Sequence, residues 1–160
     1  MRTHLLKTEL WLPRPRATIF EFFSNPRNLQ RLTPPWLDFE ILTPALIEMK
    51  IGTVFDYRLK IRGVPIRWQS KISVWEPPAR FVDEQIQGPY RLWRHEHTFH
   101  DQSGGTLVGD RVEYSAPGGW LVQKFLVGPD LERIFEYRHK TLMDLFNRHT
   151  PDDTKGIHGE

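Results

Sequence analysis

Hydrophobic and polar residues alternate with a period of two over much of the chain, and this pattern predicts β-strands. In the first of these segments, His4–Leu12, the apolar side chains of Leu6, Leu10 and Leu12 share one face. Further strands are expected at Asp38–Thr43, Thr53–Arg62, Ile66–Glu76, Arg80–Gln87, Trp93–Asp101 and Thr106–Ala116. Short turns rich in Gly and Pro separate the later strands, which favours an antiparallel meander.

Three other segments have the spacing of apolar residues that is typical of helices. Ala17–Phe23 and Arg27–Leu32 are predicted to form two short helices after the first strand. A long C-terminal helix is indicated by an apolar stripe made of Leu131, Ile134, Phe135, Leu142, Leu145 and Phe146. We expect Gly128 and Pro129 to break or kink its start, because proline cannot donate a helical hydrogen bond. A short lead-in over Trp120–Val127 would then precede it.

This order of elements predicts an α+β fold with a single domain over residues 1–150. The long terminal helix needs an apolar partner for its stripe, and the sheet is the partner that the pattern offers. A seven-stranded antiparallel sheet twists and curls, so we expect the helix to lie in its concavity. Residues 151–160 are polar and are expected to form a disordered tail.

Composition narrows the range of functions. The 160-residue chain has no Cys and a net charge of +2, with basic residues mixed among acidic ones. We therefore expect no disulfide, no thiolate metal site and no nucleic-acid partner. No apolar run is long enough for a signal peptide or a membrane span, so a cytoplasmic protein is expected. Six Trp and ten Phe suit either a packed core or the wall of a hydrophobic pocket.

Strand parity predicts which side chains face the helix. In the strand that begins at Trp93, the aromatic side chains of Trp93 and Phe99 should point inward. His95 and His97 lie on the same face of this strand and should therefore point inward as well. The same reasoning gives, for the other strands, an inner set of Phe55, Tyr57, Leu59, Ile61, Ile66, Trp68, Ser70, Ile72, Val74, Val108, Asp110, Val112 and Tyr114. The parity of Arg80–Gln87 stays ambiguous, since both of its faces carry apolar and acidic side chains.

Several of these inner residues are ionisable, which is unusual for a plain core. His95, His97 and Asp110 are costly to bury unless they pair with one another or line a wet cavity. Their number favours a cavity between the sheet and the long helix. From the helix, we expect Phe135 and Leu142 to contribute to the wall. Arg138 either binds a carboxylate at the pocket mouth or extends to solvent, and we favour the second.

Three segments resemble a known superfamily. They are FVDEQIQGPYRLWRHEHTF (81–99), SNPRNLQRLTPPW (24–36) and DRVEYSAPGG (110–119), and they are similar to the ligand-binding branch of the START/SRPBCC superfamily, which is related to the polyketide cyclase and birch-pollen-allergen groups. The resemblance implies the helix-grip fold over residues 3–149. It also implies that Phe81, Asp83 and Gln85 point inward and act together with Trp93, His95, His97 and Phe99. This fold hosts carriers, receptors, cyclases and chaperone partners, so it does not by itself fix a function.

Binding of a small hydrophobic molecule is the function that we favour from the sequence. Aromatic walls would supply affinity, and a few polar groups would fix orientation. The candidate binding residues are Tyr57, Leu59, Trp68, Ser70, Phe81, Asp83, Gln85, Trp93, His95, His97, Phe99, Asp110, Tyr114, Phe135, Arg138 and Leu142. No cofactor and no metal are assigned, and the sequence does not predict an oligomeric state.

An enzymatic function is the first alternative. With His95 as base, Asp83 as its orienting partner and Tyr57 as electrophilic donor, the site would suit a cyclase, dehydratase or isomerase that acts on a polyketide-like or aromatic substrate. His95 and His97, with Asp83 or Asp110, are also residue types that bind zinc. Hydrogen bonds between these histidines and carboxylates are the interpretation that we favour.

Protein interaction is the second alternative. The loop Leu32–Asp38 contains two prolines and Trp36, and such an exposed apolar segment can dock a partner protein. The resemblance also implies a role like that of a cell-division regulator, because members of this branch are sometimes identified as such. We favour a different role for this loop, as a lid that packs over the pocket entrance.

Overall fold

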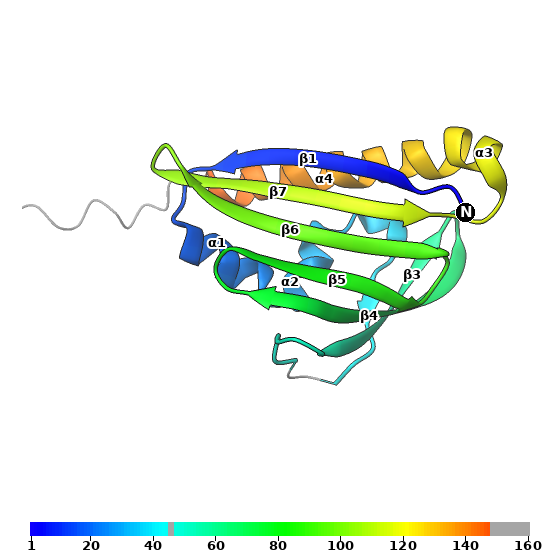
Figure 1. The fold of residues 1–160 in the computed structure, drawn as a ribbon, viewed down its shortest axis with the longest axis horizontal. Coiled ribbons are helices and arrows are strands. Elements are labelled where there is room, and N and C mark those ends of the chain that lie inside the picture. The colour runs from blue at the N-terminus through cyan, green and yellow to red at the C-terminus, as the bar shows by residue number, and fades with distance from the viewer. Residues whose placement is uncertain (45–46, 148–160) are drawn as a thin grey trace, which may run out of the picture.

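The computed structural model describes residues 1–44 and 47–147, and its centre is one seven-stranded antiparallel sheet. The strands lie in the order β1-β7-β6-β5-β4-β3-β2. Their bounds are β1 (His4–Leu12), β2 (Glu40–Ile41), β3 (Val54–Ile61), β4 (Val64–Glu76), β5 (Arg80–Gln87), β6 (Leu92–Gln102) and β7 (Gly105–Ser115). Strands β2 to β7 form a meander, and β1 pairs with β7 to form the other edge of the open sheet (Figure 1). The predicted antiparallel meander is confirmed.

The helices all lie on one side of this sheet (Figure 1). Between β1 and β2 come α1 (Arg16–Phe23), α2 (Arg27–Leu32) and the short 3₁₀ helix η1 (Pro35–Leu37). After β7 the chain forms α3 (Gly119–Val122), a π-helical turn η2 (Gln123–Val127) and the long helix α4 (Gly128–Phe146). Figure 1 shows α4 running behind the sheet along β1 and β7. The predicted helix-grip arrangement, with two short helices after the first strand, is therefore confirmed.

Of the two outcomes expected at Gly128 and Pro129, a break or a kink, the break is wrong. The chain stays helical from Gly119 through Phe146, and the irregularity is the π-helical turn directly before Gly128. Pro129 occupies the first turn of α4, where a missing backbone N–H is tolerated. A π turn re-spaces the backbone hydrogen bonds, and such turns are a common cause of helix bending. The lead-in and the long helix are consequently successive parts of a single helical segment.

Two of the predicted strands differ from the observed bounds by two residues at one or both ends, whereas β3, β6 and β7 differ by a single residue at each end. The segment Asp38–Thr43 contributes only the two-residue β2, and Asp38 adopts a left-handed conformation with φ of 46°. Strand β4 begins two residues earlier than expected, because the turn consists of Arg62 and Gly63, whose φ angles are 50° and 79°. Two residues with positive φ are typical of the tight hairpin turn that matches strand twist. Pro65 is tolerated within β4 because β5 pairs only with the later part of that strand.

A bulge in β4 changes which side chains face the helices. The pairing of β4 with β5 shifts register between Ile72 and Val74. As a result Trp75, and not the predicted Val74, packs against the core, with its ring centroid 5.2 Å from that of Phe20 and 5.5 Å from that of Phe81. A bulge inserts one extra residue, so it reverses the parity of every position beyond it.

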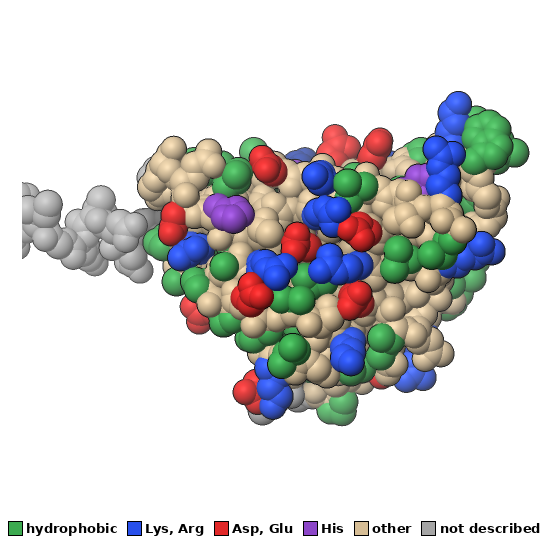
Figure 2. All heavy atoms as spheres, in the orientation of Figure 1, with side chains coloured by type: hydrophobic (Ala, Val, Ile, Leu, Met, Phe, Trp, Pro, Cys, Tyr) green, Lys and Arg blue, Asp and Glu red, His purple; other side chains and the backbone are tan. Residues whose placement is uncertain are grey.

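The core fills the space between the concave face of the sheet and the helices. Its fully buried members include Leu12, Ile19, Ile72, Phe99, Val108, Val112 and Leu142. The outer face of the sheet is polar, and Figure 2 shows basic and acidic side chains interspersed across it. Arg80, for example, donates to Glu96 across two neighbouring strands at 2.7 Å. In the described part of the chain, no helix is both long and apolar enough to cross a membrane. The predicted tail 151–160 lies outside the described residues.

Candidate functional site

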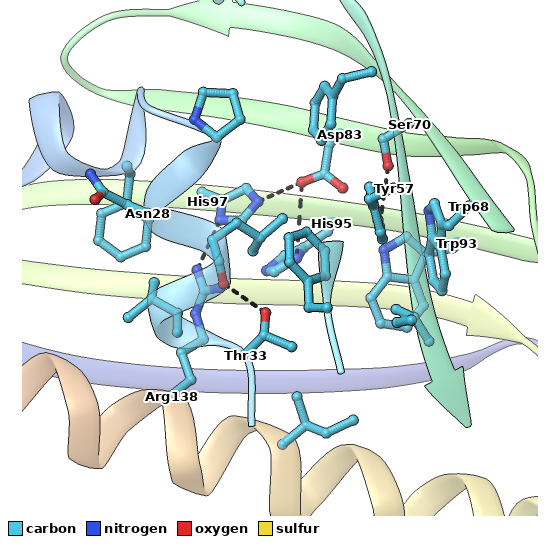
Figure 3. A pocket seen from close by; sticks show the side chains of 18 of the residues that line it. Asn28, Thr33, Tyr57, Trp68, Ser70, Asp83, Trp93, His95, His97 and Arg138 are labelled. Carbon is cyan, nitrogen blue, oxygen red and sulfur yellow. Dashed lines mark hydrogen bonds and ion pairs between the residues drawn. The ribbon is translucent and has the colours of Figure 1, made fainter. Parts of the chain in front are cut away.

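A cavity of about 180 Å³ lies between the concave face of the sheet and α4. Its wall is mostly apolar and aromatic, and it is formed by β3 to β6, α1, α2 and α4 (Figure 3). The sequence-predicted residues that line it are Tyr57, Leu59, Trp68, Ser70, Phe81, Asp83, Trp93, His95, His97, Phe135 and Arg138. The ambiguity of β5 is resolved at this point, because Phe81 and Asp83 both face the cavity.

The other five candidates, Gln85, Phe99, Asp110, Tyr114 and Leu142, lie outside the cavity wall. Phe99 and Leu142 are completely buried in the core. Asp110 is buried next to the two histidines of β6. The Gln85 amide is used by the β5–β6 connection, where it both donates to and accepts from the main chain of residue 90. The hydroxyl of Tyr114 accepts a hydrogen bond from the side chain of residue 123.

Part of the wall was not predicted. It comes from α2 and the connection before it, from the segments that flank β2, and from the connection after β5, and these residues include Asn25, Pro26, Asn28, Leu29, Phe39, Met49 and Tyr90. Leu32, Thr33 and Leu37 also line the cavity, and they belong to the loop that was expected to cover it. Irregular segments have no periodicity from which a facing direction can be read. The helical spacing of Leu29 and Leu32 in α2 was the one available signal.

Two histidine–aspartate pairs form the polar centre of the site. His97 Nε2 lies 2.6 Å from Asp83 Oδ2, and His95 Nε2 lies 2.7 Å from Asp110 Oδ1. The imidazole rings are stacked on each other, with centroids 3.7 Å apart, and the ring of His97 also stacks on Phe81 at 4.2 Å. This corrects the expected pairing of His95 with Asp83, whose Oδ2 lies 4.0 Å from His95 Nδ1.

Arg138 projects from α4 into the same cluster and does not extend to solvent, as had been favoured. It is only 5% exposed, and one of its terminal nitrogens lies 3.5 Å from Asp110 Oδ1 and 3.5 Å from His97 Nδ1. Its guanidinium lies over the rings of Phe23 and Phe135, at 5.2 Å and 5.9 Å from their centroids. A planar, weakly hydrated cation suits such a partly aromatic cage. Arg138 thus neutralises one buried carboxylate.

The cluster shifts the pKa values of its members. Burial lowers the pKa of His97 to about 4, with the neighbouring His95 acting in the same direction and the two aspartates opposing it. Burial raises the pKa of Asp83 and Asp110, but hydrogen bonds from His97 and His95 and the charge of Arg138 outweigh it, so both pKa values lie below their usual range. The aspartates are therefore ionised and His97 is neutral at pH 7.

These protonation states fix the hydrogen-bond roles. An ionised carboxylate only accepts hydrogen bonds, so the Nε2 atoms of His95 and His97 must carry the donated hydrogens. In a neutral His95 the Nδ1 lone pair is then free to accept. Among the described residues, no hydrogen bond reaches this atom, and His95 lines the cavity. We call His95 Nδ1 and the neighbouring carboxylate of Asp83 the acceptor end of the cavity.

A second polar group lies on strands β3 and β4, to one side of the cluster in Figure 3. Tyr57 and Trp68 are opposite each other in the sheet and stack with ring centroids 5.7 Å apart. The Tyr57 hydroxyl and Ser70 Oγ make only a long contact, 3.5 Å, and the buried indole N–H of Trp68 has no hydrogen-bond partner in the described residues. We call Tyr57, Trp68 and Ser70 the donor end of the cavity.

The Leu32–Asp38 loop packs over this cavity. Leu37 is buried and lines it, whereas Trp36 is half exposed on the outside. Trp36 lies against α4, where its ring meets Tyr137 edge-on at 5.8 Å and the guanidinium of Arg133 at 5.2 Å. This placement agrees with the favoured interpretation of the loop as a cover for the pocket.

Comparisons with known proteins agree with this architecture. Residues 12–138 match the family described as "Polyketide cyclase / dehydrase and lipid transport". No significant match was found among curated protein sequences.

Solved structures with the same fold come from bacteria and plants. The Zhui aromatase/cyclase from Streptomyces sp. R1128 is 12% identical, with a TM-score of 0.72 over 92% of this chain and 95% of that one. Protein CV1439 from Chromobacterium violaceum is 13% identical, with a TM-score of 0.72 over 91% and 98% of the two chains. The ginseng major latex-like protein 151 from Panax ginseng is 11% identical, with a TM-score of 0.68 over 91% and 99%. At these identities the likeness concerns the fold.

Proposed function

The chain belongs to the polyketide cyclase, dehydrase and lipid transport family of the SRPBCC superfamily, and from this premise we propose that it binds a small, ring-containing, mostly apolar molecule in its cavity. The observation that carries the proposal is the combination of apolar walls with unused hydrogen-bonding groups at two places. A volume of about 180 Å³ suits a ligand of one or two rings.

The polar groups predict what the ligand carries. The acceptor end offers the lone pair of His95 Nδ1, so it favours a ligand hydroxyl that donates a hydrogen bond. The donor end offers the hydroxyl of Tyr57, the indole N–H of Trp68 and the hydroxyl of Ser70, so it favours a carbonyl oxygen. A buried donor without a partner is unfavourable by about 1–3 kcal/mol, and a ligand carbonyl placed against it would relieve that cost.

Charge excludes one class of ligand. Asp83 and Asp110 are ionised and Arg138 is the single buried cation of the described cluster, so the cluster carries a net charge of −1 when both histidines are neutral. A ligand carboxylate at the acceptor end would meet this negative charge in a poorly solvated place. Neutral phenols and enols are therefore favoured over carboxylic acids.

Isothermal titration calorimetry with a matched panel tests this proposal. We expect 4′-hydroxyacetophenone or a two-ring hydroxyaryl ketone to bind more tightly than acetophenone or 4-ethylphenol, which each lack one polar group. The carboxylate 4-acetylbenzoate should bind more weakly than all of them. Trp68→Phe should weaken the binding of the ketones, whereas Trp36→Phe, at a half-exposed position, should leave their affinity unchanged. Equal affinity across the panel, or equal effects of both variants, would refute the proposed orientation.

The His95–Asp110 pair favours acid–base catalysis as a second candidate function. Because its Nε2–H is held by the buried carboxylate of Asp110, the imidazole of His95, which lines the cavity, can offer the Nδ1 lone pair to a bound molecule. It can remove a proton next to a ligand carbonyl, while Tyr57 and Trp68 donate to the enolate oxygen that develops. Mass spectrometry of ketones incubated in D₂O tests this, since the enzyme should accelerate deuterium uptake and His95→Gln should abolish the acceleration. Uptake at the buffer rate with wild-type protein would leave ligand binding as the function.

A further inference from the structure

We propose that Asp83, His95 and His97 form a binding site for a divalent transition-metal cation, in the first place Zn²⁺, at the cavity wall. This inference goes beyond the proposed ligand binding and does not depend on it. Carboxylate oxygen and imidazole nitrogen are common zinc ligands. The structure brings one ligand atom from each of the three residues within 4.8 Å of the others.

The strand register produces this arrangement. Asp83 on β5 lies directly opposite His95 on β6, and His97 lies two residues further on the same face of β6. Two ligands at i and i+2 on one strand and a third on its neighbour therefore converge on one point. Figure 3 shows the three side chains directed toward each other from these two strands.

The distances require small side-chain adjustments. Asp83 Oδ2 lies 2.6 Å from His97 Nε2 and 4.0 Å from His95 Nδ1. Ligand atoms of a tetrahedral zinc ion, at about 2.0–2.1 Å from the metal, lie roughly 3.3 Å from one another. The first distance must open and the second must close by about 0.7 Å each. The two imidazole rings, which are stacked with centroids 3.7 Å apart, would also have to turn out of this stack so that both lone pairs meet at the ion.

Asp110 already holds His95 in the tautomer and orientation that a metal site requires. Metal-binding histidines usually donate their second ring N–H to a carboxylate, which fixes the tautomer and the ring orientation. His95 Nε2 donates to Asp110 Oδ1 at 2.7 Å, and His97 Nδ1 lies 3.5 Å from the same oxygen. Zinc binding at His97 Nε2 would displace the ring hydrogen that Asp83 now accepts and place it on Nδ1, which lies nearest the same Asp110 oxygen. The second oxygen of Asp110 has no hydrogen-bond partner in the described residues.

The local charge also favours a cation. Asp83 and Asp110 outweigh Arg138 by one negative charge, and Arg138 stays paired with Asp110 and the two phenylalanines around it. The three ligands all line the cavity, so a tetrahedral ion would keep its fourth position open to water or to a ligand oxygen. Three protein ligands with one open position are typical of zinc sites that act on bound molecules.

The experiment is a titration of full-length, chelator-treated protein with ZnCl₂ by calorimetry and with CoCl₂ by visible absorption. We expect binding of one ion per chain and a tetrahedral Co²⁺ spectrum. Asp83→Asn and His97→Ala should each weaken binding by at least tenfold, and Asp110→Asn by about 10–100-fold. His100→Ala is the matched control, because His100 lies on the same strand but is exposed on the other face, and it should leave the affinity unchanged.

Circular dichroism of each variant establishes that it is folded before it is titrated. A stoichiometry well below one, or equal affinities of wild-type, Asp83→Asn and His97→Ala proteins, would overturn the proposal. Titration of 4′-hydroxyacetophenone in the presence of EDTA keeps the two proposals separate. Metal binding can fail while the ketone still binds, and the ketone can fail to bind while the metal site is present.

Discussion

The buried His97 should make the stability of the protein depend on pH in a defined window. Its pKa is about 4 in the folded chain, against 6.5 for a free histidine, because burial disfavours the imidazolium ion. One pKa unit corresponds to about 1.4 kcal/mol, so the difference of roughly 2.5 units corresponds to about 3 kcal/mol. The perturbation is acidification. It protonates His97 in the unfolded chain while His97 in the folded chain stays neutral.

The sign of this effect follows from proton uptake. Between pH 6.5 and pH 4 the unfolded state binds more protons at this position than the folded state, so the free energy of unfolding decreases as the pH falls. Above pH 6.5 the contribution of neutral His97 to the free energy of unfolding is fully present, and below pH 4 this contribution is lost. Asp83 and Asp110 have lowered pKa values, so their stabilising contributions are lost only at lower pH, below about 3.8. The window of His97 is thus separated from theirs.

Urea unfolding in EDTA at several pH values between 7 and 4 measures this effect. The matched variant is His97→Gln, whose amide N–H can still donate to Asp83 but does not titrate. We expect wild-type protein to lose about 3 kcal/mol more than the variant over this range. The partly buried His139 also has a lowered pKa from burial, and it is present in both proteins, so its effect cancels. Parallel curves for the two proteins, or NMR titration of the His97 ring near pH 6.5, would refute the reasoning.

Three further predictions concern individual side chains. Leu142→Ala should destabilise the protein by about 2–5 kcal/mol in thermal or urea unfolding, because Leu142 is completely buried. The neighbouring Met143 is 43% exposed, so Met143→Ala should have little effect. Gln85→Ala should cost about 1 kcal/mol, since two partly buried main-chain groups lose their partner, while the exposed Gln87→Ala should be neutral in the same assay. Trp68→Phe removes an unpaired buried donor but also part of a buried ring, and because these effects oppose each other it should destabilise the ligand-free protein less than Leu142→Ala; a loss as large as that of Leu142→Ala would contradict the assignment of an unpaired N–H.

The pattern of the sequence predicted the sheet well because alternation carries direct information on side-chain direction. His95 and His97 were placed inward from the aromatic residues that bracket them, and both are buried. The same rule failed at Val74, because a β-bulge has no signature in the alternation and reverses the parity beyond it. Local periodicity thus determines a face only as far as the strand remains regular.

The contacts within the site could not be predicted in the same way. The pairing of His95 with Asp110 depends on the register between β6 and β7, which no local pattern reports. Arg138 was expected in solvent because a lone arginine on an apolar face usually extends outward. Its burial depends on Asp110, a partner 28 residues away on a different element. Such long-range electrostatic partners become visible only when the strands and α4 are placed together.

The measurement that tests the central claim most directly is an NMR titration of ¹⁵N-labelled protein with 4′-hydroxyacetophenone. Binding in the cavity, with its hydroxyl at the acceptor end and its carbonyl at the donor end, predicts saturable shifts of the Trp68 indole N–H and of the His95 ring nitrogens. It also predicts intermolecular NOEs to the rings of Trp93 and Phe135, which line the same cavity. Saturable shifts confined to surface residues such as Trp36, with the Trp68 and His95 signals unchanged, would contradict the account.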